Sequence, residues 1–155
     1  MLPKLETLRL EDLTSSIGVT FRRGYSATTT YLDILIVSYT GQYPLGSSGN
    51  SDARYMFAMG NAALHAYSPS GVIIDMSELH YQWGDMLEMV FGIGSDQYVD
   101  AEFPMATVVG PHCREAVRTL IHGENSEKQI EDIGWMFDSL EAAWDYVDSL
   151  LNKKA

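Results

Sequence analysis

The sequence predicts a single α/β domain, with a mostly parallel, mixed sheet of four to five strands and about four helices. Three observations predict this class. Strand-like and helix-like segments alternate in the order β-β-α-β-α-β-α-β-α, which is typical of parallel sheets with crossover helices. The run Val72–Ile74 is continuously apolar, as expected of a strand buried on both faces. A chain of 155 residues can bury one core of this kind.

The amino-terminal part is predicted to hold an extension and the first two strands. Residues 1–16 form the extension, because their leucines fit neither a helical nor a strand period, and the α/β domain is expected over residues 17–152. Ile17–Arg23 and Tyr31–Thr40 are rich in β-branched and aromatic residues, which favours an antiparallel pair of strands. Gly41–Asn50 contains glycine, proline and serine, and is predicted to be a loop.

The middle of the chain is predicted to hold a helix, the central strand and a second helix. Residues 51–67 carry apolar side chains at helical spacing, and Pro69 ends this helix. The central strand follows, and Asp75 interrupts its apolar run. This charge predicts that the chain reaches the carboxyl edge of the sheet at Asp75. Gly84 then opens a helical segment with inward-facing apolar residues.

The last third is predicted to contain two more strand–helix units. Residues 92–104 form a loop, and Met105–Val109 has the character of a buried strand. Pro111 suits the first turn of the next helix, where its missing N–H is not needed. Ile133–Phe137 is predicted to be the last strand, and the apolar stripe over residues 140–151 predicts the last helix.

The charge of the chain restricts its partners. There are 21 acidic residues against 10 basic ones, for a net charge of −11. Nucleic acids and anionic membrane surfaces are bound through clustered Lys and Arg, so both are excluded as expected partners. An acidic surface associates rapidly with basic proteins, so a basic protein partner stays open beside the plain alternative that the charge serves solubility.

The cellular location is predicted from what the sequence lacks. Cys113 is the only cysteine, so no disulfide forms within the chain and a reducing compartment fits. The first residues carry acids and no long apolar core, unlike a secretory signal. No apolar run approaches membrane-spanning length. The expectation is a cytoplasmic protein without membrane insertion.

The usual signatures of catalysis and of metal or cofactor binding are weak. Cys113 follows a helix start, where a thiol can become reactive, but free cysteines are more often core residues. The four histidines show no metal-binding spacing. Ser77, Glu78 and His80 lie near Asp75, but without a nucleophile elbow. We therefore predict no catalytic residues, no metal and no cofactor.

Three stretches resemble one known family. They are DILIVSYTG (33–41), GVIIDMSELHYQWGDML (71–87), and MATVVGPHCREAVRTLI (105–121) followed by WMFDSLEAAWDYV (135–147). Their pattern of apolar and turn residues is similar to that of STAS domains, the family of anti-sigma-factor antagonists and sulfate-transporter cytoplasmic domains. The resemblance implies a STAS-like fold and a non-catalytic regulatory role, with an anti-sigma-type kinase as one class of partner.

One departure from that family concerns its phosphorylation switch. Many members carry a phosphorylatable serine at the start of the helix after the central strand. Here the corresponding positions are Trp83, Gly84 and Asp85, so a hydroxyl is missing. The carboxylate of Asp85 is favoured at a helix start and can imitate part of a phosphate's charge, although a phosphate carries more charge and more acceptors.

Two hypotheses for the function follow. In the first, a regulatory protein-binding domain docks its partner through Tyr81, Trp83, Gly84 and Asp85, since exposed aromatics are common interface anchors. In the second, a small-molecule-binding protein or small enzyme uses a pocket at the carboxyl edge of the sheet. That pocket would be lined by Tyr43, Asp75, Ser77, His80 and His112. Both hypotheses leave a homodimer open.

Overall fold

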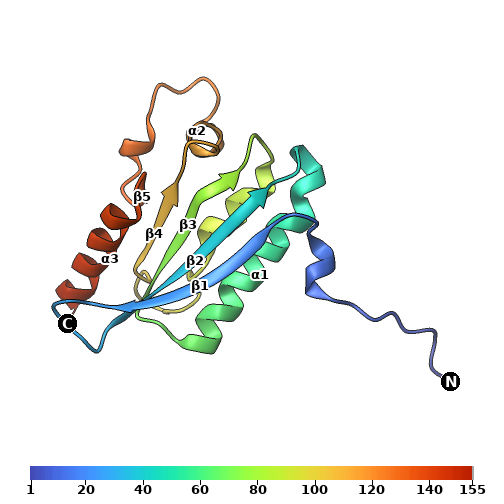
Figure 1. Cartoon of the computed structure of the whole chain (residues 1–155), viewed down its shortest axis with the longest axis horizontal. Coiled ribbons are helices and arrows are strands. Elements are labelled where there is room, and N and C mark those ends of the chain that lie inside the picture. Colours follow the sequence, from blue (N-terminus) through green and yellow to red (C-terminus); the bar gives the residue numbers. More distant parts are fainter. Residues whose placement is uncertain (155) are drawn as a thin grey trace.

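The computed structural model describes residues 1–154, and within them the chain folds around a five-stranded sheet (Figure 1). The strands lie side by side in chain order, with β1 antiparallel to β2 and the later pairs parallel. Their bounds are β1 (Gly18–Tyr25), β2 (Asp33–Gln42), β3 (Gly71–His80), β4 (Met105–Val109) and β5 (Met136–Phe137). The predicted mixed sheet is confirmed, with the apolar run Val72–Ile74 in its middle strand.

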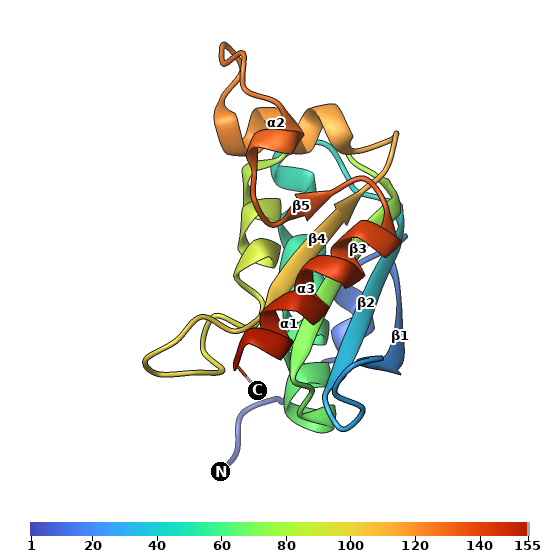
Figure 2. The same cartoon turned by 90° about the vertical axis from the view of Figure 1, so that its left-hand side faces the viewer.

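Helices cover both faces of this sheet. The α-helices are α1 (Asn50–Tyr67), α2 (Arg114–His122) and α3 (Leu140–Lys154). The 3-10 helices are η1 (Leu10–Leu13), η2 (Gly46–Gly49), η3 (Asp85–Gly92) and η4 (Ile130–Asp132). Figure 2 shows α3 crossing one face of the sheet, with α1 on the other side. The predicted helical positions are therefore filled by α1, η3, α2 and α3.

Strand alternation divides the core between the two faces. Val72 and Ile74 of β3 belong to the apolar cluster under α1, and Ile73 between them belongs to the cluster under α3. All three side chains are fully buried. Successive side chains of a strand point to opposite faces, so a central strand covered on both sides must be apolar at every position.

The prediction that Asp75 marks the carboxyl edge is wrong. Asp75 lies opposite Ser38 of β2 and Val108 of β4, and β3 continues for five more residues to His80. The strand continues because backbone pairing with β2 resumes after a bulge and does not depend on side-chain polarity. The charge is tolerated because the carboxylate accepts hydrogen bonds from Ser38 and from the backbone N–H of Ser77, and forms an ion pair with Arg22.

The helix after Gly84 exists, but it is a 3-10 helix. Its hydrogen bonds join residues three apart, as from Leu87 N–H to the Gly84 carbonyl at 3.3 Å. Gly84 itself has φ +145°, a conformation that residues with a side chain rarely adopt. The chain therefore turns sharply at Gly84 before the helix begins.

The amino-terminal extension touches the domain near its end. Residues before η1 leave the body as extended chain (Figure 1). The hydroxyl of Thr14 donates a hydrogen bond to the buried Asp52 of α1, which fastens the chain just before β1. The domain boundary between residues 16 and 17 stays a prediction. None of the helices among residues 1–154 is long and apolar enough to span a membrane.

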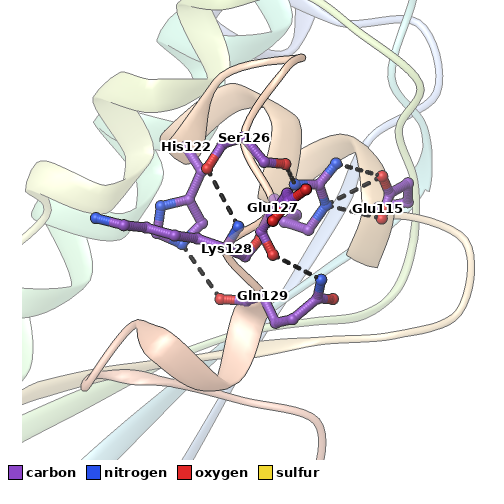
Figure 3. A network of polar contacts seen from close by, with 7 residues as sticks. Glu115, His122, Ser126, Glu127, Lys128 and Gln129 are labelled. Atoms are coloured by element: carbon purple, nitrogen blue, oxygen red, sulfur yellow. Dashed lines mark hydrogen bonds and ion pairs between the residues drawn. The ribbon is translucent and has the colours of Figure 1, made fainter.

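The segment after α2 is held by a network of polar contacts (Figure 3). Arg118 of α2 donates to both carboxylate oxygens of Glu115, and also to the carbonyls of Ser126 and Lys128. The ring of His122 contacts the carbonyl of Gln129 at 3.2 Å. A capping box joins Gln129 to Asp132 at η4. This network keeps a long polar segment in one conformation.

Cys113 is a core residue rather than a reactive thiol. It is buried, and its sulfur lies 3.3 Å from the carbonyl of Met76. Burial raises the pKa of the Cys113 thiol to about 11. The thiolate is the reactive form of cysteine, so the folded chain holds its only thiol in the unreactive form at neutral pH.

We expect Cys113 to resist modification by iodoacetamide at neutral pH while the protein is folded, and to react fully in denaturant. Because the folded pKa lies above that of an exposed thiol, the contribution of this group to stability is present at neutral pH. That contribution is lost as the pH rises through about 11. Mass spectrometry of the protein after treatment with iodoacetamide measures how much of Cys113 is modified. Rapid labelling of the native protein would contradict this account.

Candidate functional site

The turn Tyr81–Asp85, here called the exit turn, leaves β3 at the carboxyl edge of the sheet. Backbone hydrogen bonds tie it to the segments that follow the neighbouring strands. Tyr81 N–H donates to the carbonyl of His112 at 3.1 Å, and Gly46 N–H donates to the carbonyl of Trp83 at 3.1 Å. The exit turn is therefore fixed from both sides.

Two buried tyrosines, Tyr43 and Tyr81, support the exit turn from the protein interior. The hydroxyl of Tyr81 donates a hydrogen bond to the carbonyl of Gly84 at 2.9 Å, which closes the turn on itself. The ring of Tyr43 packs edge-on against the ring of Tyr81, with centroids 5.2 Å apart. Burial raises the pKa of both hydroxyls, that of Tyr43 to about 12. Both tyrosines therefore stay neutral and act as packing groups.

Close packing at the exit turn requires glycine at two positions. A Cβ on Gly84 would lie 2.9 Å from Cε1 of Tyr43, and one on Gly46 would lie 2.4 Å from Cη2 of Trp83. Both glycines also have positive φ, at +145° and +58°. The indole of Trp83 therefore rests directly on the backbone of Gly46, and the position of this exposed side chain is fixed by contact.

The outer surface of the exit turn combines apolar and acidic side chains. Trp83 is 61% exposed, and Leu45, next to the glycine under the indole, is 52% exposed. Asp85 and Glu88 are exposed, and the charges of both raise the pKa of Tyr81, which places them near its hydroxyl. We call Leu45, Trp83, Asp85 and Glu88 the docking face.

The four residues predicted to bind a partner therefore have different positions. Trp83 and Asp85 lie on the surface, whereas Tyr81 and Gly84 are buried. Tyr81 is only 2% exposed, so it shapes the turn and does not itself offer a contact. Leu45 was missed, because nothing in the loop sequence shows that it lies beside the exit turn.

The five residues predicted for a pocket lie in three places. Tyr43 is buried in the core on the α1 side. His80 and His112 are exposed and stack on each other, with ring centroids 4.1 Å apart and an interplanar angle of 11°. Asp75 and Ser77 line a separate open hollow. Within residues 1–154, no group of three or more His, Cys, Asp or Glu is placed to hold a metal ion.

The open hollow, here called the polar hollow, lies on the α3 face of the sheet and has a volume of about 400 Å³. Side chains from three strands line it: Thr20, Arg22, Ser38, Thr40, Asp75 and Ser77. Of these residues, only Asp75 and Ser77 were predicted from the sequence to line a pocket. Alternation along β1 and β2 gives the shared face of the others, but the strand order is needed to bring them together.

Comparison with known proteins supports the fold. No protein-family model matches the chain, and no curated protein matches it. The chain is similar to the crystal structure of an anti-sigma factor antagonist from Mycobacterium paratuberculosis, with 16% sequence identity and a TM-score of 0.54. The match covers 85% of this chain and 94% of that one. The STAS-like fold that the resemblance implied is thus confirmed.

The two tyrosines under the exit turn give a stability test. The Tyr43 hydroxyl is buried and has no hydrogen-bond partner among the described residues, whereas that of Tyr81 bonds Gly84. We expect Tyr81→Phe to lower the free energy of unfolding by about 1–2 kcal/mol, because a buried carbonyl loses its donor. We expect Tyr43→Phe to leave stability unchanged or to raise it.

Urea unfolding of the two variants and the parent protein measures these differences. The substitutions are chemically identical and lie 5.2 Å apart by ring centroids, so each serves as the control for the other. Equal losses in both variants would mean that the bond to Gly84 does not support the turn.

Proposed function

We propose that the chain is a non-catalytic regulatory domain that binds a protein partner through the docking face. The observation that carries this proposal is Trp83, a tryptophan that is 61% exposed and yet held in place by contact with Gly46. Tryptophan is enriched among the residues that contribute most to binding energy at protein interfaces. Exposing so large an apolar side chain gains nothing for folding, which supports a role in binding.

Charge indicates the kind of partner. The docking face carries two exposed carboxylates, Asp85 and Glu88, and the chain as a whole carries a net charge of −11. Complementary charges around an apolar centre speed association and exclude partners of the same sign. The partner proposed is therefore a protein with an apolar pocket bordered by Lys or Arg.

The rigidity of the exit turn favours binding without rearrangement. Its backbone is bonded to the segments that follow β2 and β4, and the Tyr81 hydroxyl closes it internally. Ordering a flexible loop costs free energy on binding, and a turn that is already fixed avoids this cost. A rigid turn is suited to constitutive docking, which agrees with the missing hydroxyl at Trp83, Gly84 and Asp85.

Similarity of fold supports a regulatory role. The similar solved structure is named as an anti-sigma factor antagonist, so its name describes a protein that acts on a regulatory protein. We transfer this class of role to the present chain, and an anti-sigma-type kinase is one partner of that class. The second hypothesis, a carboxyl-edge pocket of five residues, is not carried forward in that form because only Asp75 and Ser77 of the five line the hollow.

Trp83→Ala should abolish partner capture. We expect a loss of at least about 2 kcal/mol in binding free energy, since buried tryptophan anchors are worth this much at interfaces. The melting temperature should change little, because the side chain is mostly exposed. The measurement is quantitative mass spectrometry of proteins captured from a lysate of the source organism, compared between the parent protein and the variant.

Tyr31→Ala is the matched control. Tyr31 is also aromatic and 75% exposed, but it precedes β2 and so lies at the opposite end of the sheet from the exit turn. The partner is defined as a protein that is retained by the parent and by the control and is lost with Trp83→Ala. If no protein shows this pattern, or if Tyr31→Ala loses the same proteins, the docking face is not the binding site.

Asp85→Lys should act on association rather than on folding. Asp85 is exposed, and a basic partner approaching it would meet a reversed charge. We expect the association rate to fall by about ten-fold at low salt and the difference to shrink as salt is added, because ions screen exposed charges. Surface plasmon resonance with the captured partner at two salt concentrations measures this. An association rate that changes neither with the substitution at Asp85 nor with the salt concentration would exclude charge steering.

A further inference from the structure

The polar hollow is a part of the sheet that no helix covers. On the α3 face, Ile36 and Ile73 lie in the apolar cluster packed under the helix. The next row on the same face contains Thr20, Ser38 and Asp75, which lie opposite one another on β1, β2 and β3. Leu140, the first residue of α3, lines the hollow, so the helix begins next to the polar row and does not cover it.

The floor of the hollow holds a nearly buried charge. Asp75 is only 8% exposed. Ser77 N–H donates to its Oδ1 at 3.0 Å, and the Ser38 hydroxyl donates to its Oδ2 at 3.1 Å. The Arg22 guanidinium forms an ion pair with Oδ2 at 3.8 Å, a separation longer than a hydrogen bond. A carboxylate accepts about four hydrogen bonds, so Asp75 retains acceptor capacity toward the hollow.

The lining selects for one class of ligand. Four hydroxyl-bearing residues, Thr20, Ser38, Thr40 and Ser77, line the hollow. The Ser38 hydroxyl donates its hydrogen to Asp75 and so offers a ligand an acceptor, whereas a hydroxyl has one donor and two acceptor sites in general. Asp75 and Glu78 supply two carboxylates against the single guanidinium of Arg22, whose side chain is 59% exposed. The local balance is negative, and the net charge of −11 adds to it. A cation with several hydroxyls fits this lining, whereas an anion does not.

We infer that the polar hollow binds a small polyhydroxylated amine, with the ammonium group on Asp75 and the hydroxyls on the surrounding Ser and Thr side chains. A volume of about 400 Å³ is within the range of small-ligand sites and accommodates one sugar ring. Binding would place a cation in hydrogen-bond contact with Asp75, closer than the Arg22 guanidinium at 3.8 Å. This site lies on the sheet face and does not include any residue of the docking face.

Glucosamine is the test probe, because glucose has the same ring without the charge and gluconate carries the opposite charge. Each is titrated to about 10 mM into ¹⁵N-labelled protein at about pH 6.5, where such an amine is protonated. We expect glucosamine to shift the amide signals of Ser38, Asp75 and Ser77 along a saturable curve. Binding of glucose and gluconate should be weaker by about ten-fold or more.

Asp75→Asn tests the role of the carboxylate. The amide keeps an acceptor for Ser77 N–H but removes the charge, and affinity for glucosamine should fall by about ten-fold. Asp85→Asn removes a charge from the docking face and should leave the affinity unchanged. Because the ranking of the three probes is measured on the parent protein, the inference can be tested even if Asp75→Asn does not fold.

Three results would overturn the inference. One is the absence of saturable shifts at the hollow with glucosamine. The second is binding of gluconate as tight as that of glucosamine. The third is equal glucosamine affinity in a folded Asp75→Asn variant and in the parent protein. None of these results bears on partner capture by the docking face, because the two sites share no residue.

Discussion

The structure depends on β3 being buried between two layers of helices. Its alternating side chains enter both apolar clusters, so Val72 and Ile74 hold α1 in place while Ile73 holds α3. Parallel pairing with β2 and β4 places it in the centre of the sheet. β3 is therefore held by a neighbouring strand on each side and by a helix on each face. The segment that follows it at the carboxyl edge begins at a position that is already fixed. The exit turn and the polar hollow both use this rigidity.

The exit turn shows how backbone packing can hold an exposed side chain. Gly46 and Gly84 let the chain approach the rings of Trp83 and Tyr43 more closely than any residue with a Cβ allows. The hydroxyl of Tyr81 donates its hydrogen bond to the carbonyl of Gly84, within the turn itself. The result is an indole that faces solvent without the freedom usual for a surface side chain. Such a side chain loses little entropy on binding, which makes it suited to docking.

The polar hollow arises from a mismatch between the length of the strands and the length of the helix that covers them. β2 and β3 continue beyond the start of α3, and the residues that they place in the hollow include Ser, Thr, Asp and Glu. The two proposed sites therefore lie in different places, one on a face of the sheet and the other at its carboxyl edge. A small ligand and a protein partner would not compete for the same residues.

The spacing of apolar residues along the sequence by itself determined the class of fold, because it shows which side chains are buried in each helix and strand. It located Val72–Ile74 in the centre of the sheet and Trp83 and Asp85 just beyond it. It could not show that Tyr81 is buried, that Asp75 lies within β3, or that Arg22 and Ser38 lie near Asp75. Those facts depend on the register between strands and on where a helix begins. Both are set by contacts between residues far apart in the chain, and only the tertiary structure decided them.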